Sequence, residues 1–147
     1  MTYLFLHIIS ILLFLGNTSN ELTNSPSEPI VIIVNESIEI DQIDINELID
    51  IYTLSKQRWD DNTRIRVADY KGSQDIRDTF YNALHTTPNN IKKIWLRAQF
   101  TGRSIPPIVV DSVDEMWKVV LENPGTIGYV PFNQVPVNAK ILLQIDG

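Results

Sequence analysis

The apolar positions of the chain fall into short continuous runs that are separated by segments of helical spacing. Residues 29–35, "PIVIIVN", form an unbroken apolar run, as expected of a strand buried on both faces of a sheet. Four further strands are predicted: one through Ile65 and Val67, one at the end of 102–110, and two at 126–132 and 139–145.

Four segments between these strands have the spacing of amphipathic helices. Residues 44–54 begin with a capping-box pair, Asp44 and Glu47, and residues 112–123 begin with another, Ser112 and Glu115. The apolar faces predicted for the two middle helices are Ile76, Phe80 and Leu84 in 73–85, and Ile91, Ile94, Trp95 and Ala98 in 88–100. Strands interleaved with helices predict an α/β fold, in which a mainly parallel sheet is flanked by helices.

The N-terminus has a different pattern. Residues 3–15, "YLFLHIISILLFL", are mostly apolar and uncharged, but shorter than the roughly 20 residues that span a bilayer. This length fits a secretory signal peptide, although no Lys or Arg precedes the run and no A-x-A site follows, so an uncleaved anchor or a core helix is the alternative. We therefore expect a signal peptide at 1–20, cleaved near residues 16–20, a flexible lead at 21–29 and one domain at 30–147. The mature protein would then be periplasmic or secreted.

Composition and charge narrow the function. The 147 residues include no cysteine, which excludes disulfides, thiolate metal sites and a cysteine nucleophile. A net charge of −6 argues against general nucleic-acid binding. Residues 21–55 hold eight acidic residues and no basic one, whereas residues 56–103 hold ten basic and five acidic, an excess of 10 − 5 = +5. An anion would be attracted to this middle third, although Lys92 and Lys93 are expected on a solvated helix face.

One stretch of the middle third, "ADYKGSQDIRDTFY", combines residues that suit an anion. Gly72 and Ser73 lie where a strand gives way to a helix, and Arg77 follows one turn later. Backbone N–H groups at a helix start favour negative charge, glycine permits close approach, and serine and arginine can donate hydrogen bonds. The alternative is ordinary local structure: Ser73 caps the helix, Gly72 makes the turn, and Arg77 pairs with Asp78 or Asp61. The spacing alone leaves both interpretations open.

The other candidate residues give weaker indications of a binding or catalytic site. The three tryptophans, Trp59, Trp95 and Trp117, are expected in or near the core rather than as ligand platforms. Arg103, in the loop "FTGRSIPP", would either reach an anion or face water. His85 has no Cys or Ser partner at motif spacing, and no catalytic, metal or cofactor motif is present. We therefore expect a protein that is not an enzyme and needs no cofactor.

Three stretches resemble the periplasmic phosphate-binding proteins of ABC transporters, in particular their short PBP-like relatives. They are "INELIDIYTLSKQRWDDNTRIRV", "ADYKGSQDIRDTFYNAL" and "ENPGTIGYV", the last being close to the family's P-G-A-I-G-Y-V. The resemblance implies one lobe of a type 2 solute-binding fold, with phosphate or a similar oxyanion as ligand. Ser73 lies at the place of the family's anion-contacting serine, beside Gly72, and Arg77 lies on the same helix in the short relatives. The loop of Arg103 also resembles a loop of these relatives.

Two departures from the family pattern affect what the resemblance implies. The family's S-G-T run is replaced by Ser73, Gln74 and Asp75, and Asp75 would repel an anion unless it points away. The chain is also short, so it resembles the second lobe with its connecting strands and offers half of a binding cleft.

Two functions follow from these observations. In the first, the exported protein binds phosphate or another oxyanion, with the membrane subunits of an ABC transporter as candidate partners. In the second, the fold is kept as an interaction module for another envelope protein, and the acidic segment 36–48, "ESIEIDQIDINEL", is its contact edge. The alternative for this segment is a loop packed on its own domain. The sequence does not distinguish a monomer from a dimer.

Overall fold

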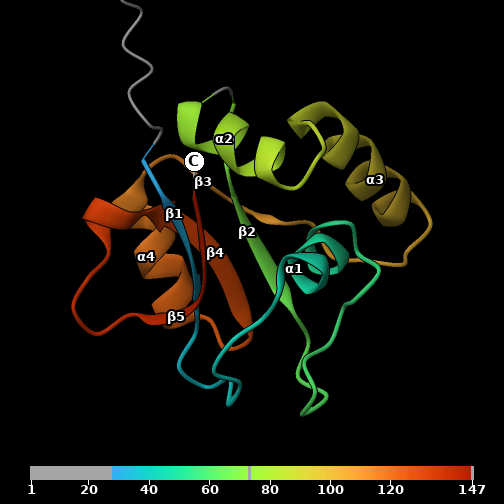
Figure 1. Ribbon diagram of the computed structural model, residues 1–147. Helices are drawn as coiled ribbons and strands as arrows, with labels where there is room; N and C mark the ends of the chain where they lie inside the picture. The colour runs from blue at the N-terminus through green and yellow to red at the C-terminus, as the bar shows by residue number, and fades with distance from the viewer. Residues whose placement is uncertain (1–27, 73, 147) are drawn as a thin grey trace, which may run out of the picture.

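The computed structural model describes residues 28–72 and 74–146, which form a five-stranded sheet with the order β3-β2-β4-β1-β5 (Figure 1). The strands are β1 (Ile30–Val34), β2 (Arg66–Tyr70), β3 (Ile108–Val110), β4 (Thr126–Pro131) and β5 (Lys140–Ile145). β2 pairs in parallel with β3 and β4, whereas β1 pairs antiparallel with β4 and β5. Four strands therefore run in one direction and β1 runs against them, which confirms the mainly parallel sheet.

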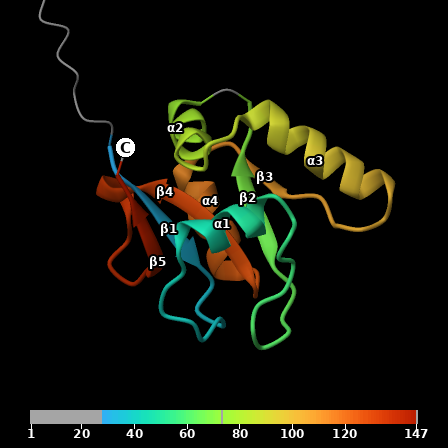
Figure 2. The same cartoon turned by 45° about the vertical axis from the view of Figure 1, so that its right-hand side comes forward.

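Helices cover both faces of this sheet. They are α1 (Ile45–Tyr52), α2 (Asp75–Ala83), α3 (Pro88–Phe100) and α4 (Val113–Glu122), with a short 3-10 turn η1 (Phe132–Gln134). Consecutive residues of a strand face opposite sides. A Cβ on Gly128 would lie 2.5 Å from Met116 of α4, whereas the ring of Tyr129 stacks on Phe80 of α2 with a centroid distance of 3.8 Å. Thus α4 covers one face, and α1 and α2 lie on the other (Figure 2).

The three tryptophans confirm their expected place in the core. Trp59, Trp95 and Trp117 are 3%, 6% and 8% exposed. Each indole N–H donates to a backbone carbonyl, at 2.8 Å in the bond from Trp95 of α3 to Tyr52 of α1. That bond holds α3 on the same side of the sheet as α1. The expected apolar face of α3 is wrong at one position, since Ile94 is 37% exposed.

The starts of α1 and α4 have the predicted N-cap bonds, but neither predicted capping box is closed by its return bond. Asp44 accepts from the Glu47 N–H at 2.8 Å, as predicted, and Ser112 accepts from the Glu115 N–H at 3.2 Å. The Glu115 carboxylate, however, accepts from the Asp111 N–H at 2.7 Å and not from Ser112. In the second capping box, the Glu115 carboxylate therefore accepts from the residue before the N-cap and not from the N-cap itself.

The acidic segment 36–48 packs on its own domain. Ile38 and Ile43 are 1% and 6% exposed, and Ile40 packs against the core from a partly buried position. The Ile43 N–H donates to the Leu142 carbonyl of β5 at 3.2 Å. This is the intramolecular alternative, so the alternating isoleucines do not form an exposed contact edge.

The expected signal peptide, its cleavage region and most of the flexible lead lie outside the described residues. In the part of the chain that the structure describes, no helix is both long and apolar enough to cross a membrane.

Candidate functional site

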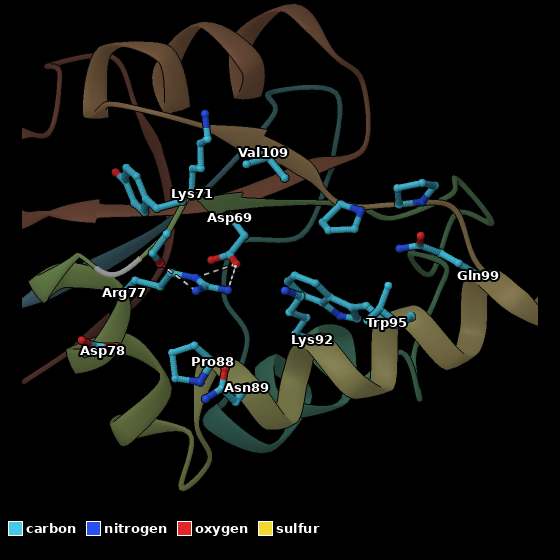
Figure 3. Close-up of a pocket in the computed structure, with 15 residues that line it drawn as sticks. Asp69, Lys71, Arg77, Asp78, Pro88, Asn89, Lys92, Trp95, Gln99 and Val109 are labelled. Atoms are coloured by element: carbon cyan, nitrogen blue, oxygen red, sulfur yellow. Dashed lines mark hydrogen bonds and ion pairs between the residues drawn. The ribbon is translucent and has the colours of Figure 1, made fainter.

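A cleft of about 590 Å³ opens between α3, the carboxyl end of β2 and the start of α2 (Figure 3). Its charged and polar lining comprises Asp69, Lys71, Gly72, Arg77, Asp78, Asn89, Lys92 and Gln99. Its remaining lining comprises Tyr70, Pro88, Trp95, Leu96, Pro106, Pro107 and Val109. The carboxyl ends of parallel strands are where open α/β sheets usually bind ligands.

The floor of the cleft comes from two neighbouring strands. Asp69 of β2 and Val109 of β3 are register partners, so their side chains share one face of the sheet. Tyr129 of β4 shares this face, because its hydroxyl donates to the Asp69 carboxylate at 2.7 Å. This is also the face that carries α2, while the exposed edge strand β3 leaves Val109 54% exposed.

Arg77 reaches from α2 to Asp69 and is held there. Its Nε and Nη2 atoms both lie 2.9 Å from Asp69 Oδ2, and its Nη1 donates to the Gly72 carbonyl at 2.9 Å. The side chains of Arg77 and Asp69 are 14% and 3% exposed. An ion pair for Arg77 was one of the two interpretations from sequence, but the expected partners, Asp78 and Asp61, are wrong. The partner is Asp69, because the carboxyl end of β2 lies beside the first turn of α2.

The ion pair leaves Arg77 charged and rigid. Burial lowers the pKa of the Arg77 guanidinium, but the hydrogen bond and the charge of Asp69 outweigh this effect and raise the pKa above its ordinary value. A guanidinium has five N–H groups, and the contacts to Asp69 and Gly72 use three. Two N–H groups therefore remain for a ligand, on a side chain whose net charge is balanced by Asp69.

Buried tyrosines surround the same carboxylate. Burial, followed by the charge of Asp69, raises the pKa of the Tyr129, Tyr81 and Tyr52 hydroxyls above their ordinary value. Tyr129 therefore stays protonated and donates to Asp69. The Tyr81 hydroxyl is buried and has no hydrogen-bond partner among residues 28–72 and 74–146. The Tyr129 hydrogen bond therefore orients Asp69 and, through it, Arg77.

The turn between β2 and α2 supplies the other polar groups. Gly72 lines the cleft with φ +71°, a conformation that favours glycine. Lys71 Nζ lies 3.7 Å from Asp111, and both side chains are about 70% exposed, so this contact holds the ammonium weakly. Ser73 lies outside the described residues. The N-cap position of α2 is Gln74, whose side chain makes no cap bond and donates to the Lys71 carbonyl at 2.9 Å. The expected cap at position 73 is therefore one residue off.

The four candidate residues from sequence are only partly brought together. Gly72 and Arg77 line the cleft side by side. Arg103 is exposed in the loop after α3, and the cleft lining does not include it. Sequence reasoning missed Asp69 and Lys71, and it placed Lys92 on a solvated face. Lys92 is exposed, and it also lines the cleft. Its helical spacing with Pro88 and Trp95 is the signal that could have identified this face of α3.

Comparisons with solved structures identify the fold. The chain superposes on an ABC-type phosphate transport receptor from Vibrio cholerae with a TM-score of 0.62 and 17% identity, covering 78% of this chain and 45% of the receptor. It superposes on a protein from Clostridium perfringens that was solved with bound phosphate. The TM-score is 0.65 and the identity 17%, covering 78% of this chain and 44% of that protein. It also superposes on PstS from Borrelia burgdorferi, with a TM-score of 0.58 and 20% identity, covering 78% of this chain and 46% of PstS.

The chain spans less than half the length of these three proteins. No family model and no curated protein sequence matches it. The similarity therefore establishes the PBP-like fold of phosphate-binding proteins, over a length that corresponds to one lobe.

Proposed function

We propose that this protein is a non-catalytic module that binds phosphate or a similar oxyanion at the start of α2. The observation that carries the proposal is the meeting of Gly72 and Arg77 at one end of the cleft, where β2 ends. The likeness in fold to a protein solved with bound phosphate supports the choice of anion.

The arrangement gives each group a separate part in binding. Arg77 offers two N–H groups in a fixed orientation, because Asp69 and the Gly72 carbonyl hold its guanidinium. The Lys71 side chain points away from Arg77 (Figure 3) and is only weakly held by Asp111, so it adds positive charge near the site without direct contact. Backbone N–H groups at the start of α2 favour negative charge in the same place. Asp69 balances the charge of Arg77, so we expect moderate affinity from a single lobe.

The wider function is part of the same proposal. The N-terminal pattern supports export, and the phosphate transport receptor among the solved structures supports the membrane subunits of an ABC transporter as partners. One observation favours a second function, an envelope interaction module without a high-affinity ligand: the Asp69 carboxylate already occupies the Arg77 guanidinium. Ser73 and Arg103 remain candidate contacts in the first proposal.

Calorimetric titration with phosphate separates the two functions. We expect saturable binding that weakens modestly in Lys71→Gln, because a positive charge next to Gly72 is removed. Lys118→Gln is the matched control, since Lys118 is an exposed lysine on α4, which covers the opposite face of the sheet. No heat of binding at millimolar phosphate would overturn the proposal in favour of the interaction module.

A further inference from the structure

We infer that the cleft takes an amphiphilic anion, namely a phosphate monoester with an apolar or aromatic group, in preference to inorganic phosphate. This inference rests on the proposed function, because the anionic group would occupy the end formed by Gly72 and Arg77. The inference adds the chemical class of the group that is attached to the phosphate.

The cleft is larger than inorganic phosphate requires. Its volume of about 590 Å³ lies within the range of roughly 300–1,000 Å³ found for small-molecule sites. An inorganic phosphate has the bulk of a few water molecules, each of which takes about 30 Å³ in the liquid. Most of the cleft would therefore remain unfilled around phosphate alone.

The cleft is also elongated along α3. Pro88, Lys92, Trp95 and Gln99 line it, and their spacing of three or four residues places them on one face of the helix. At a rise of 1.5 Å per residue, this face runs for about 16 Å. Figure 3 shows the Asp69–Arg77 pair toward one end of this wall and Gln99 toward the other. A ligand held by its anionic group at the first end would extend along α3.

The surface along this path is apolar. Leu96 of α3 is 41% exposed and Val109 of β3 is 54% exposed, and both line the cleft with Pro106 and Pro107 of the connecting loop. Trp95, which is 6% exposed, also lines the cleft, and Val109 lies beside Asp69 on the neighbouring strand. Apolar side chains that face one another across a cleft gain when a ligand removes them from water. An aromatic group is the matching chemistry.

A second cation lies within the same wall. Lys92 is exposed, lines the cleft one turn before Trp95, and forms no ion pair with any residue of the described ranges 28–72 and 74–146. Lys92 precedes Trp95 and Leu96 on α3, so it can engage an ester-bound phosphate while the ester group lies against the apolar side chains. The cleft thus has two cations, Arg77 and Lys92, next to an apolar surface.

Three probes test the inference by calorimetry on the purified protein: inorganic phosphate, methyl phosphate and phenyl phosphate. Methyl phosphate carries the same ester group without an aromatic ring. We expect phenyl phosphate to bind about tenfold more tightly than methyl phosphate, as burial of an aromatic ring would give. Phenol alone should bind weakly, because the anionic group supplies the anchor.

Two exposed apolar positions of the cleft test the contact with the ring. Leu96→Asn and Val109→Ser should each remove most of the advantage of phenyl phosphate over methyl phosphate. Leu121→Asn is the matched control, because Leu121 is 57% exposed on α4 and outside the cleft. Lys92→Gln should weaken both esters, whereas Lys93→Gln, at the neighbouring exposed lysine, should weaken neither.

The outcomes distinguish this inference from the proposed function. Equal affinity for methyl and phenyl phosphate, with saturable binding of both, would overturn the inference and leave the proposed function standing. An advantage of phenyl phosphate that persists in both Leu96→Asn and Val109→Ser would also overturn it, because the ring would then bind elsewhere. Binding of none of the three probes would overturn the proposed function and the inference together.

Discussion

Arg77 on α2 and Asp69 on β2 form a hydrogen-bonded ion pair at the polar end of the cleft, with two nitrogen atoms of Arg77 at 2.9 Å from one carboxylate oxygen of Asp69. The pair fixes the guanidinium and also balances its charge. The pair should therefore stabilise the folded protein and, at the same time, weaken the binding of an anion.

Asp69→Asn tests this opposition. Removing one partner of a largely buried pair leaves an uncompensated charge, so we expect the free energy of unfolding to fall by about 3 kcal/mol. Phosphate affinity should rise, because the negative charge at the cleft floor is lost. Urea unfolding and titration with phosphate measure the two effects. Asp78→Asn is the control, since Asp78 also lines the cleft but is exposed, and a similar loss of stability there would contradict the account.

Tyr129→Phe and Tyr81→Phe form a matched pair. Tyr129 donates to the Asp69 carboxylate, so its hydroxyl should contribute about 1.5–3 kcal/mol to the free energy of unfolding. The buried Tyr81 hydroxyl has no partner in the described part of the chain, so its removal should be neutral or stabilising. Urea unfolding measures both variants. An equal fall in the free energy of unfolding would show that the Tyr129 hydrogen bond does not stabilise the protein.

Alkaline pH should unfold the protein through its buried tyrosines. Tyr52, Tyr70, Tyr81 and Tyr129 have pKa values raised above the ordinary value of 10.0, mainly by burial. Their neutral form is therefore favoured in the folded state, and the unfolded state releases protons first. The stability that this provides is complete below pH 10 and falls as the pH rises further. Unfolding free energies and phenolate absorbance between pH 8 and 11 measure this effect, and a flat profile would contradict it.

Two glycines with similar backbone angles should differ in their tolerance of a side chain. Gly125 has φ +76°, and a Cβ there would lie 2.4 Å from the Arg64 carbonyl oxygen. Gly72 has φ +71°, but nothing lies within 4 Å of its Cβ position. Gly72→Ala should therefore cost only the left-handed strain of about 1–2 kcal/mol. Gly125→Ala should cost clearly more, and thermal unfolding of both variants measures the difference.

The fold could be predicted because its signals are local. The apolar run that became β1 is buried along its whole length, and the Asp44 cap begins α1 at Ile45. The conformation of Gly125 explains the glycine of "NPGTIGYV", since this turn must pass close to the Arg64 carbonyl. The exposure of Ile94 could not be predicted, because helical spacing does not show which edge of an apolar face lacks a partner.

The site could be predicted only in part, because its groups meet across the sheet. Gly72 and Arg77 are five residues apart, so their proximity follows from the helix start. The partner of Arg77 could not be predicted, because Asp69 is oriented by Tyr129, 60 residues away. Lys92 and Val109 come to the cleft from α3 and β3, and only the packing of α3 beside the edge strand brings them together.

Amide chemical shifts during a phosphate titration test the central claim most directly. We expect saturable shifts that are largest at the backbone N–H groups of Gly72 and Asp75, with a smaller change at the Arg77 side-chain N–H. The amides of α4, on the opposite face of the sheet, should remain unchanged. Shifts that are absent at millimolar phosphate, or that are largest on α4, would contradict anion binding at the start of α2.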